Sequence, residues 1–408
     1  MKARALVLLF LAAGAQAAPG APSALPPEAE VRRVLASLPA LRQGVLNTQL
    51  AGAERDKLAA GPYEWTVRAG ASRRSAPGAE RYLEQEVALE RPLRWFGKAD
   101  QDQALGEQGL TVARALHGDA WHEAGRALLR DWFDALRDLA GVVRLEEQLA
   151  VTQRLQAIAA RRVQAGDGAA LDLLQAETEQ RRVLALLQQA RQRSEQTLTL
   201  LAISYPGLPR PQADSLPLPQ AGSEDASSWT ERIVHDNHEL QLALAEADLY
   251  AMRASRLASD AMPDPTLALR AARERDGQER VFGVSLSFPL PGAGRTADRS
   301  AAAIKAAMAR ERVAQTQLRV ALAARRAASD SVHSHAIWST LQEVQQQPMR
   351  QAELMQHAYQ AGECTLADAL AGRRQALDAA LTAQTAQIEA LTAQARLQLD
   401  AHAIWSID

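Results

Sequence analysis

The sequence of 408 residues has few long hydrophobic runs, no excess of basic residues and a single cysteine. After the first 17 residues no uncharged apolar run approaches the ~18 residues that a membrane-spanning helix needs. The 46 basic and 48 acidic residues leave a net charge of -2, which argues against nucleic acid as a partner. Because Cys364 is alone, an internal disulfide and a thiolate metal site are both excluded.

The first 17 residues are typical of a secretory signal peptide. Lys2 and Arg4 precede an apolar run, and Ala15–Gln16–Ala17 has the small residues of a cleavage site. We therefore expect a destination outside the cytoplasm, with an extended N-terminal segment over residues 18–29.

Proline is scarce over two long stretches that are rich in Ala, Leu, Gln, Arg and Glu. This composition predicts helices, one of which, over 97–164, would be about 100 Å long. A glycine turn at Gly166 would return the chain into a second helix over 169–204. That second helix has an apolar seam with alternating spacings of four and three, at Val183, Leu187, Ala190, Ser194, Thr197 and Leu201. The spacing is typical of a coiled coil, although an ordinary helical bundle with an alanine-rich core would show it too.

The chain contains an internal repeat. The tripeptide Gln-Ala-Gly that ends at Gly166 recurs 196 residues later, ending at Gly362, and in both copies an aspartate and a leucine follow at the same distances. These residues are Asp172 and Leu174 in the first copy and Asp368 and Leu370 in the second. We expect two repeats, over 30–205 and 229–408, joined by a proline-rich linker over 206–228.

Each repeat also has a place where the apolar residues alternate with a period of two. This predicts two pairs of strands, at about 63–71 and 80–92 and at about 265–273 and 281–289. Strands of this length can cross a bilayer when tilted, and four strands per chain would need several copies to close a barrel. Two exposed hairpins on a helical protein would give the same pattern.

The signal peptide, the two repeats and the Gly-x5-Asp turns together resemble the TolC-type outer membrane efflux proteins of Gram-negative bacteria, over nearly the whole mature chain. The segments 91–98 (RPLRWFGK) and 288–291 (FPLP) look most like the CzcC-like heavy-metal efflux subgroup. The resemblance implies a mainly α-helical fold with a small membrane β part. In a homotrimer, twelve strands would form a barrel among the lipids of the outer membrane, continuous with a helical tube in the periplasm.

The resemblance also implies a function and site residues. The protein would be a passive, gated path for heavy-metal cations, supplied by a periplasmic adaptor protein and an inner-membrane RND-type pump. The adaptor would dock at the hairpin tips, around Gly166, Leu174, Gly362 and Leu370. The pore gate would comprise Asp172, Tyr359 and Asp368, while helix capping is a second interpretation of both aspartates. Cys364 and Ala371 replace an arginine and an aspartate that other family members carry.

Three glutamates, Glu84, Glu86 and Glu90, share one face of an expected strand. They would line the barrel interior if Val87 and Leu89 face lipid, and an acidic lumen would favour cations. Three arginines of the expected strands, Arg68, Arg270 and Arg273, would offset part of this charge.

Catalytic and metal-binding motifs are missing from the sequence. It has no glycine-rich phosphate loop, G-x-S-x-G or H-E-x-x-H motif, so we expect no enzyme activity, no catalytic residues and no cofactor. The pairs His333/His335 and His235/His238 are interpreted as solvated histidines in preference to metal ligands. The alternative function is a periplasmic coiled-coil adaptor or scaffold without a membrane barrel, although adaptors contain one helical hairpin and this chain predicts two.

Overall fold

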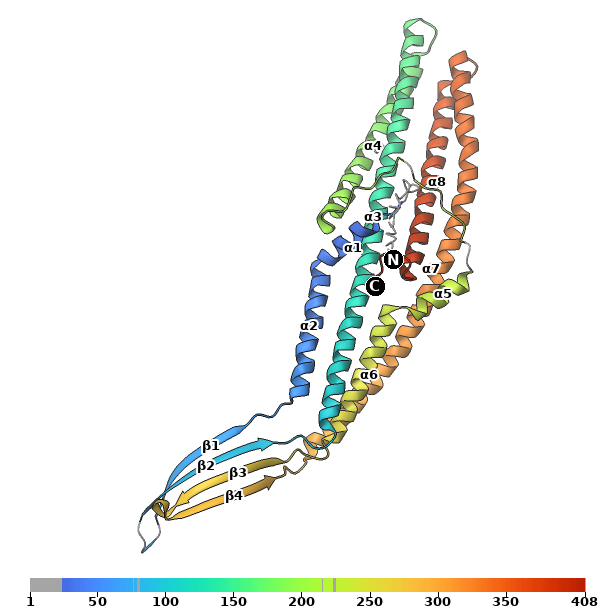
Figure 1. The fold of residues 1–408 in the computed structure, drawn as a ribbon. Helices are drawn as coiled ribbons and strands as arrows, with labels where there is room; N and C mark the ends of the chain where they lie inside the picture. Colours follow the sequence, from blue (N-terminus) through green and yellow to red (C-terminus); the bar gives the residue numbers. More distant parts are fainter. Residues whose placement is uncertain (1–23, 76, 79–80, 215, 223–224, 408) are drawn as a thin grey trace, which may run out of the picture.

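The computed structural model of the chain describes residues 24–75, 77–78, 81–214, 216–222 and 225–407. The expected signal peptide at 1–17 and residues 18–23 of the expected extended segment lie outside the described residues. Figure 1 shows an elongated molecule in which two long helical hairpins point one way and a small sheet lies at the opposite end.

The elements recur in the same order in both halves of the chain. The first half contains α1 (Glu28–Ser37), α2 (Pro39–Ala60), β1 (Thr66–Arg74), β2 (Tyr82–Pro92), α3 (Lys98–Gln164) and α4 (Ala170–Ser204). The second half contains α5 (Ala226–His235), α6 (His238–Ser259), β3 (Thr266–Glu274), β4 (Glu279–Ser287), α7 (Ala293–Ala361) and α8 (Leu366–Asp400). A short 3₁₀ turn, Arg275–Gly277, joins β3 to β4.

Some boundaries differ from those expected. Residues 28 and 29 are helical and not extended, because α1 begins after Pro27 with acidic residues in its first turn. Helix α5 begins at Ala226, inside the expected linker, since its buried Ile233 gives it an apolar side to pack against the core. Strand β1 begins at Thr66 because Tyr63 leaves the ladder to hydrogen-bond another segment. Strand β2 ends at Pro92 as expected, and the other strand ends move by one to three residues.

The four strands form one antiparallel sheet in the order β1-β2-β3-β4. The central β2–β3 pair joins the two repeats, with Val87 opposite Ala271. Strands β1 and β4 are the sheet edges within one chain. Each edge therefore presents a row of backbone donors and acceptors that no strand of the same chain pairs.

The largest core lies midway along the helices, where α1, α3, α4 and α8 meet. Its fully buried side chains include Leu35, Leu128 and Leu136. Along α4 the seam residues Val183, Leu187, Ala190, Ser194 and Leu201 are buried, which places them where their spacing predicts. Among the helices of the described residues, none combines the length and the apolar character required to cross a membrane.

Candidate functional site

The two helical hairpins turn at glycines. Gly166, just after α3, has φ 80°, and Gly362, at the C-terminal cap of α7, has φ 84°. This left-handed conformation strains any residue with a Cβ, whereas the space around both glycines would accept one. Both turns lie at the end of the molecule farthest from the sheet (Figure 1). The repeat thus places the two predicted tips at the same end.

Tyr359 connects the two hairpins near the tips. Its side chain is buried in a cluster that includes Leu155 and Leu366. Arg162 of α3 donates a hydrogen bond to the carbonyl oxygen of Tyr359 at 2.9 Å, and its guanidinium lies 5.1 Å from the centre of the tyrosine ring. Burial and the nearby carboxylate of Asp172 raise the pKa of Tyr359. Arg162, which the sequence did not single out, therefore holds the predicted gate tyrosine in place.

Leu174 and Leu370 occupy equivalent repeat positions but different surroundings. Leu174 is 60% exposed, whereas Leu370 is 4% exposed and packs in the cluster around Tyr359. As placed in one chain, Leu370 is a core residue and offers no docking surface, because its face of α8 lies against the first hairpin. The docking prediction therefore reduces to the two glycine turns and Leu174.

The two predicted gate aspartates also differ. Thr365 accepts a hydrogen bond from the backbone N–H of Asp368, and its hydroxyl donates to the Asp368 carboxylate at 2.6 Å. The bond from the backbone N–H makes Thr365 the N-cap of α8, and Asp368 is the acidic residue of the first turn, so the capping interpretation describes Asp368 within one chain. Asp172 lies in the first turn of α4 and is close enough to raise the pKa of Tyr359. The gate role of both stays a prediction.

A second connection between the hairpins is a buried ion pair that the sequence analysis missed. The Glu179 carboxylate of α4 is 1% exposed and accepts hydrogen bonds from Arg182 of the same helix and Arg374 of α8. Burial opposes its ionisation, but these bonds hold the pKa of Glu179 below its usual value. Glu179 lies four residues before Val183 on the apolar seam of α4, and a charge at a seam position is the signal that could have revealed it.

The two faces of the sheet differ in polarity. The polar face carries Arg68, Arg74, Glu84, Glu86, Glu90 and Arg270. The apolar face carries Val67, Val87, Leu89, Leu269, Phe282, Val284 and Leu286. Several of these apolar side chains are more than half exposed in the single chain, including Val67 at 68% and Phe282 at 82%. A face of this kind is suited to contact with lipid.

Each predicted lumen glutamate forms an ion pair on the polar face. Arg68 pairs with Glu90 at 2.7 Å, Arg74 with Glu84 at 3.0 Å and Arg270 with Glu86 at 2.9 Å. The pairs place the three glutamates together, as predicted from their alternation. They also neutralise the glutamates, so the polar face is less acidic than the sequence suggested.

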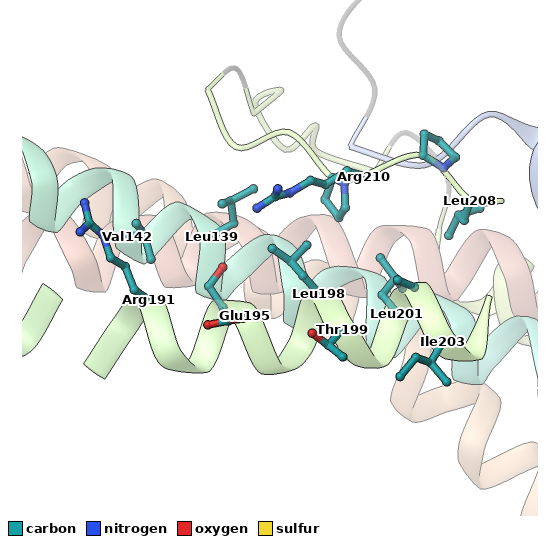
Figure 2. A pocket seen from close by; sticks show the side chains of 14 residues that line it. Leu139, Val142, Arg191, Glu195, Leu198, Thr199, Leu201, Ile203, Leu208 and Arg210 are labelled. Atoms are coloured by element: carbon teal, nitrogen blue, oxygen red, sulfur yellow. The ribbon is translucent and has the colours of Figure 1, made fainter. Parts of the chain in front are cut away.

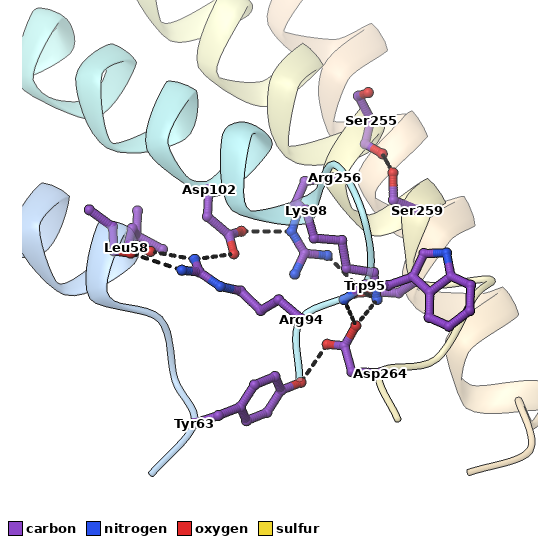
Figure 3. Close-up of polar contacts among 12 residues, drawn as sticks. Leu58, Tyr63, Arg94, Trp95, Lys98, Asp102, Ser255, Arg256, Ser259 and Asp264 are labelled. Atoms are coloured by element: carbon purple, nitrogen blue, oxygen red, sulfur yellow. Dashed lines mark hydrogen bonds and ion pairs between the residues drawn. The ribbon is translucent and has the colours of Figure 1, made fainter. Parts of the chain in front are cut away.

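A polar network joins the sheet to the helices (Figure 3). The Asp264 carboxylate, just before β3, accepts hydrogen bonds from the Tyr63 hydroxyl at 2.5 Å and the Trp95 N–H at 2.9 Å. Lys98, which is 2% exposed, forms ion pairs with Asp264 at 2.8 Å and with Asp260 at 2.9 Å. Burial and the bond to Asp264 raise the pKa of Tyr63 to about 12. Segments of both repeats are thus fixed to each other where the strands leave the helices.

Arg94 extends this network to α2. It donates hydrogen bonds to the backbone carbonyls of Leu58 and Ala59, and it pairs with Asp102 at 3.3 Å. Asp102 also accepts a hydrogen bond from Arg256 of α6 at 2.6 Å. Residues 91–98, the basis of the expected subgroup, therefore have a structural role at this junction.

Neither a protein-family model nor a curated protein sequence matches the chain. Several solved structures do match its fold. The outer membrane channel CmeC of Campylobacter jejuni has a TM-score of 0.75 and 14% identity, covering 93% of this chain and 86% of CmeC. The outer membrane protein VceC of Vibrio cholerae has a TM-score of 0.74 and 16% identity, covering 91% of this chain and 95% of VceC.

The open state of the outer membrane channel MtrE of Neisseria gonorrhoeae has a TM-score of 0.64 and 16% identity, covering 92% of this chain and 88% of MtrE. The chain has an outer membrane channel fold. In this fold the hairpin turns and the sheet described above form opposite ends of one elongated subunit (Figure 1).

An apolar groove lies outside the channel features. It has a cavity volume of about 520 Å³ and lies between the base of the α3–α4 hairpin and the chain that follows α4 (Figure 2). Leu139, Leu198 and Leu201 line it, with Arg191 and Glu195 also on the lining. Arg191 forms an ion pair with Glu146 at 2.6 Å.

Histidines cluster at the middle of the molecule. The rings of His122, His238 and His402 lie 4.5 to 6.0 Å apart, and His122 lies 3.2 Å from the buried Asp400 carboxylate. In the described part of the chain, no three His, Cys, Asp or Glu side chains are placed to hold one metal ion. His235, interpreted as a solvated histidine, is exposed and bonds Asp236, whereas His238 is half-buried in the histidine cluster.

Proposed function

We propose that the chain is a TolC-type outer membrane channel subunit that gives a tripartite efflux system its passive path to the outside of a Gram-negative cell. The observation that carries the proposal is the sheet at the end of the molecule opposite the hairpin turns (Figure 1). It has one apolar face, one ion-paired polar face and two edges that no strand of the same chain pairs. A sheet of this kind is suited to lipid only when its edges are paired.

The open edges support a homotrimer. Pairing β4 of one subunit with β1 of the next satisfies the backbone of both edges. Three subunits would pool twelve strands, enough for a barrel with an aqueous lumen lined by the polar faces. The helices of the three subunits would continue this lumen as a periplasmic tube.

The hairpin tips lie at the end of the molecule opposite the sheet. They are the proposed contact for a periplasmic adaptor protein and its inner-membrane RND-type pump. Gly166, Gly362 and the exposed Leu174 would form this contact. The pump supplies the energy, so the channel subunit is proposed to act without catalysis and without a cofactor. Nucleic acid has no role in this function.

Heavy-metal cations are the proposed cargo. The support is the similarity of residues 91–98 and 288–291 to the CzcC-like subgroup. A deletion strain that regains tolerance to divalent heavy-metal salts, and not to hydrophobic dyes, on complementation would support this cargo. Restored tolerance to dyes alone would contradict it.

Membrane fractionation and planar-bilayer recording test the channel itself. We expect the chain in the outer membrane fraction, a trimer with heat-modifiable gel mobility, and pores in the bilayer. A water-soluble monomer would favour the alternative, a periplasmic adaptor or scaffold.

Substitutions at the turns test the tip assignment. Gly166→Leu and Gly362→Leu should abolish efflux while the trimer persists, because both glycines have φ near 80°. Gly52→Leu, in α2 with no heavy atom within 4 Å of an added Cβ, is the matched control and should keep efflux. Efflux that survives at both turn variants would contradict the docking assignment.

A further inference from the structure

Arginines on the two faces of the sheet have different surroundings. On the polar face, Arg68, Arg74 and Arg270 each pair with a glutamate. On the apolar face, Arg73, Arg273 and Arg280 are exposed, and within the described part of the chain none of their side chains forms an ion pair or hydrogen bond. We name these three residues the arginine row.

The strand register places the arginine row at the loop end of the sheet, with Arg73 on β1 two strands away from Arg273 on β3. Arg273 of β3 lies directly opposite Arg280 of β4, and Arg73 of β1 lies opposite Leu83 near the same end of the sheet. Like charges placed directly opposite in an antiparallel pair are destabilising. Among the described residues, no strand carboxylate shares this face, and the turn residue Asp276, near Arg73, accepts a hydrogen bond from the backbone N–H of Leu83. We therefore expect an anion from outside the chain to offset the repulsion between Arg273 and Arg280.

The arginine row borders the apolar face at its loop end. From Arg280 toward the helices, the same face presents Phe282, Val284 and Leu286, and the chain then reaches Phe288, whose ring lies 6.3 Å from that of Trp95. At ~3.3 Å per residue, Arg280 and Phe288 are about 26 Å apart. At the ~35–45° tilt of barrel strands this length spans roughly 19–22 Å along the membrane normal, close to the ~25 Å apolar band that aromatic residues border. The long arginine side chains extend beyond it, so their guanidinium groups reach the level of the lipid headgroups.

We propose that the arginine row binds the phosphate groups of lipids in the leaflet at the loop end of the sheet. This inference rests on the proposed membrane location of the sheet. Each planar guanidinium can donate two parallel hydrogen bonds to a phosphate. We expect the bound phosphate to belong to a lipid and not to be free inorganic phosphate. The apolar side chains directly beside the arginine row would contact the acyl chains of the same lipid molecule.

Binding of fluorescent phosphatidic acid to the detergent-solubilised full chain, followed by anisotropy, tests the inference. The triple variant Arg73→Gln, Arg273→Gln and Arg280→Gln should bind about a hundredfold more weakly, at roughly fivefold per arginine. Arg-to-Lys replacements at the same sites keep the charge but lose the paired donors, so they should fall between wild type and the glutamine variant. The matched control, Arg68, Arg74 and Arg270 all changed to Gln on the polar face, should bind like wild type.

Three outcomes would overturn the inference: equal binding by wild type and the arginine-row variant, an equal loss in the polar-face control, or full displacement of the lipid by inorganic phosphate at concentrations matching the lipid. These results are separable from the proposed function. A chain that forms trimeric pores but fails this test loses the lipid site alone, whereas a chain that forms no pores loses the proposed function.

Discussion

Glu179 of α4 and Arg374 of α8 form an ion pair that joins the two helical hairpins, with Arg374 Nε 2.8 Å from Oε2 of Glu179. The carboxylate is 1% exposed and also binds Arg182. Because the pair connects segments from both repeats, it fixes how the hairpins lie beside each other. Arg162 and Tyr359 make a second connection closer to the turns.

Arg374→Met should loosen the hairpins more than it changes the rest of the fold. Glu179 would keep Arg182, so we expect the loss of one charge-assisted hydrogen-bonding partner, ~1.5–3 kcal/mol. Hydrogen exchange should accelerate in α4 and α8 near the pair. The control is Arg191→Met, which breaks the exposed pair with Glu146 and should cost less than ~1 kcal/mol. Equal effects of the two variants would contradict a structural role for the buried pair.

The helices and strands could be predicted from the sequence because each has its own period. The absence of proline marked the long helices, Gly166 and Gly362 marked turns that need a left-handed residue, and alternation marked the strands. The partners Glu179 and Arg374 could not be predicted. Their pairing depends on how two helices are rotated and staggered against each other, and the repeat gives no help because Gln375 occupies the position equivalent to Glu179.

An internal repeat does not predict whether equivalent residues are equally buried, as Leu174 and Leu370 show. The sequence makes them equivalent, but α8 packs against both α7 and α3, whereas α4 packs mainly against α3. One leucine is therefore buried and the other exposed. Burial in a folded chain depends on neighbours that a local pattern does not contain.

Lys98→Met should weaken the junction between sheet and helices. Lys98 is 2% exposed and is the shared cation of Asp260 and Asp264. Asp260 would keep Arg256, but Asp264, 10% exposed, would lose its cation and keep only the hydrogen bonds from Tyr63 and Trp95, at a cost of about 3 kcal/mol. The denaturation midpoint of the purified protein should fall accordingly. Lys305 is an exposed lysine in α7, and Lys305→Met is the matched control. It should change the free energy of unfolding by less than ~0.5 kcal/mol. A Lys98 variant as stable as the control would show that the network is not needed.

We expect the ionised Asp400 carboxylate to make the free energy of unfolding fall at acidic pH. Burial opposes its ionisation, but the hydrogen bond with His122 and the charges of Arg126 and Arg396 hold the pKa of Asp400 well below its usual value. A carboxyl whose pKa is lower in the folded state than in the unfolded state stabilises the folded protein when the pH is above the unfolded-state pKa, ~3.9. This contribution is lost as the pH falls below that value toward the folded-state pKa.

We therefore expect Asp400→Asn to be less stable than wild type at about pH 5, and the difference to narrow at about pH 3. Thermal denaturation of both proteins at the two pH values measures the gap. A gap that stays constant or widens toward acid contradicts the assignment of Asp400.

The ion pairs on the polar face should control the ion selectivity of the pore. Arg270→Gln leaves Glu86 without its partner at 2.9 Å, so each subunit gains one uncompensated negative charge in the proposed lumen. The reversal potential in a salt gradient should shift toward cation preference. Glu86→Gln leaves Arg270 uncompensated and should shift it in the opposite direction, toward anions. The double variant removes both charges and should return close to wild type, because the pair is neutral in both proteins. If the two single variants shift the potential in the same direction, the polar face does not line the pore.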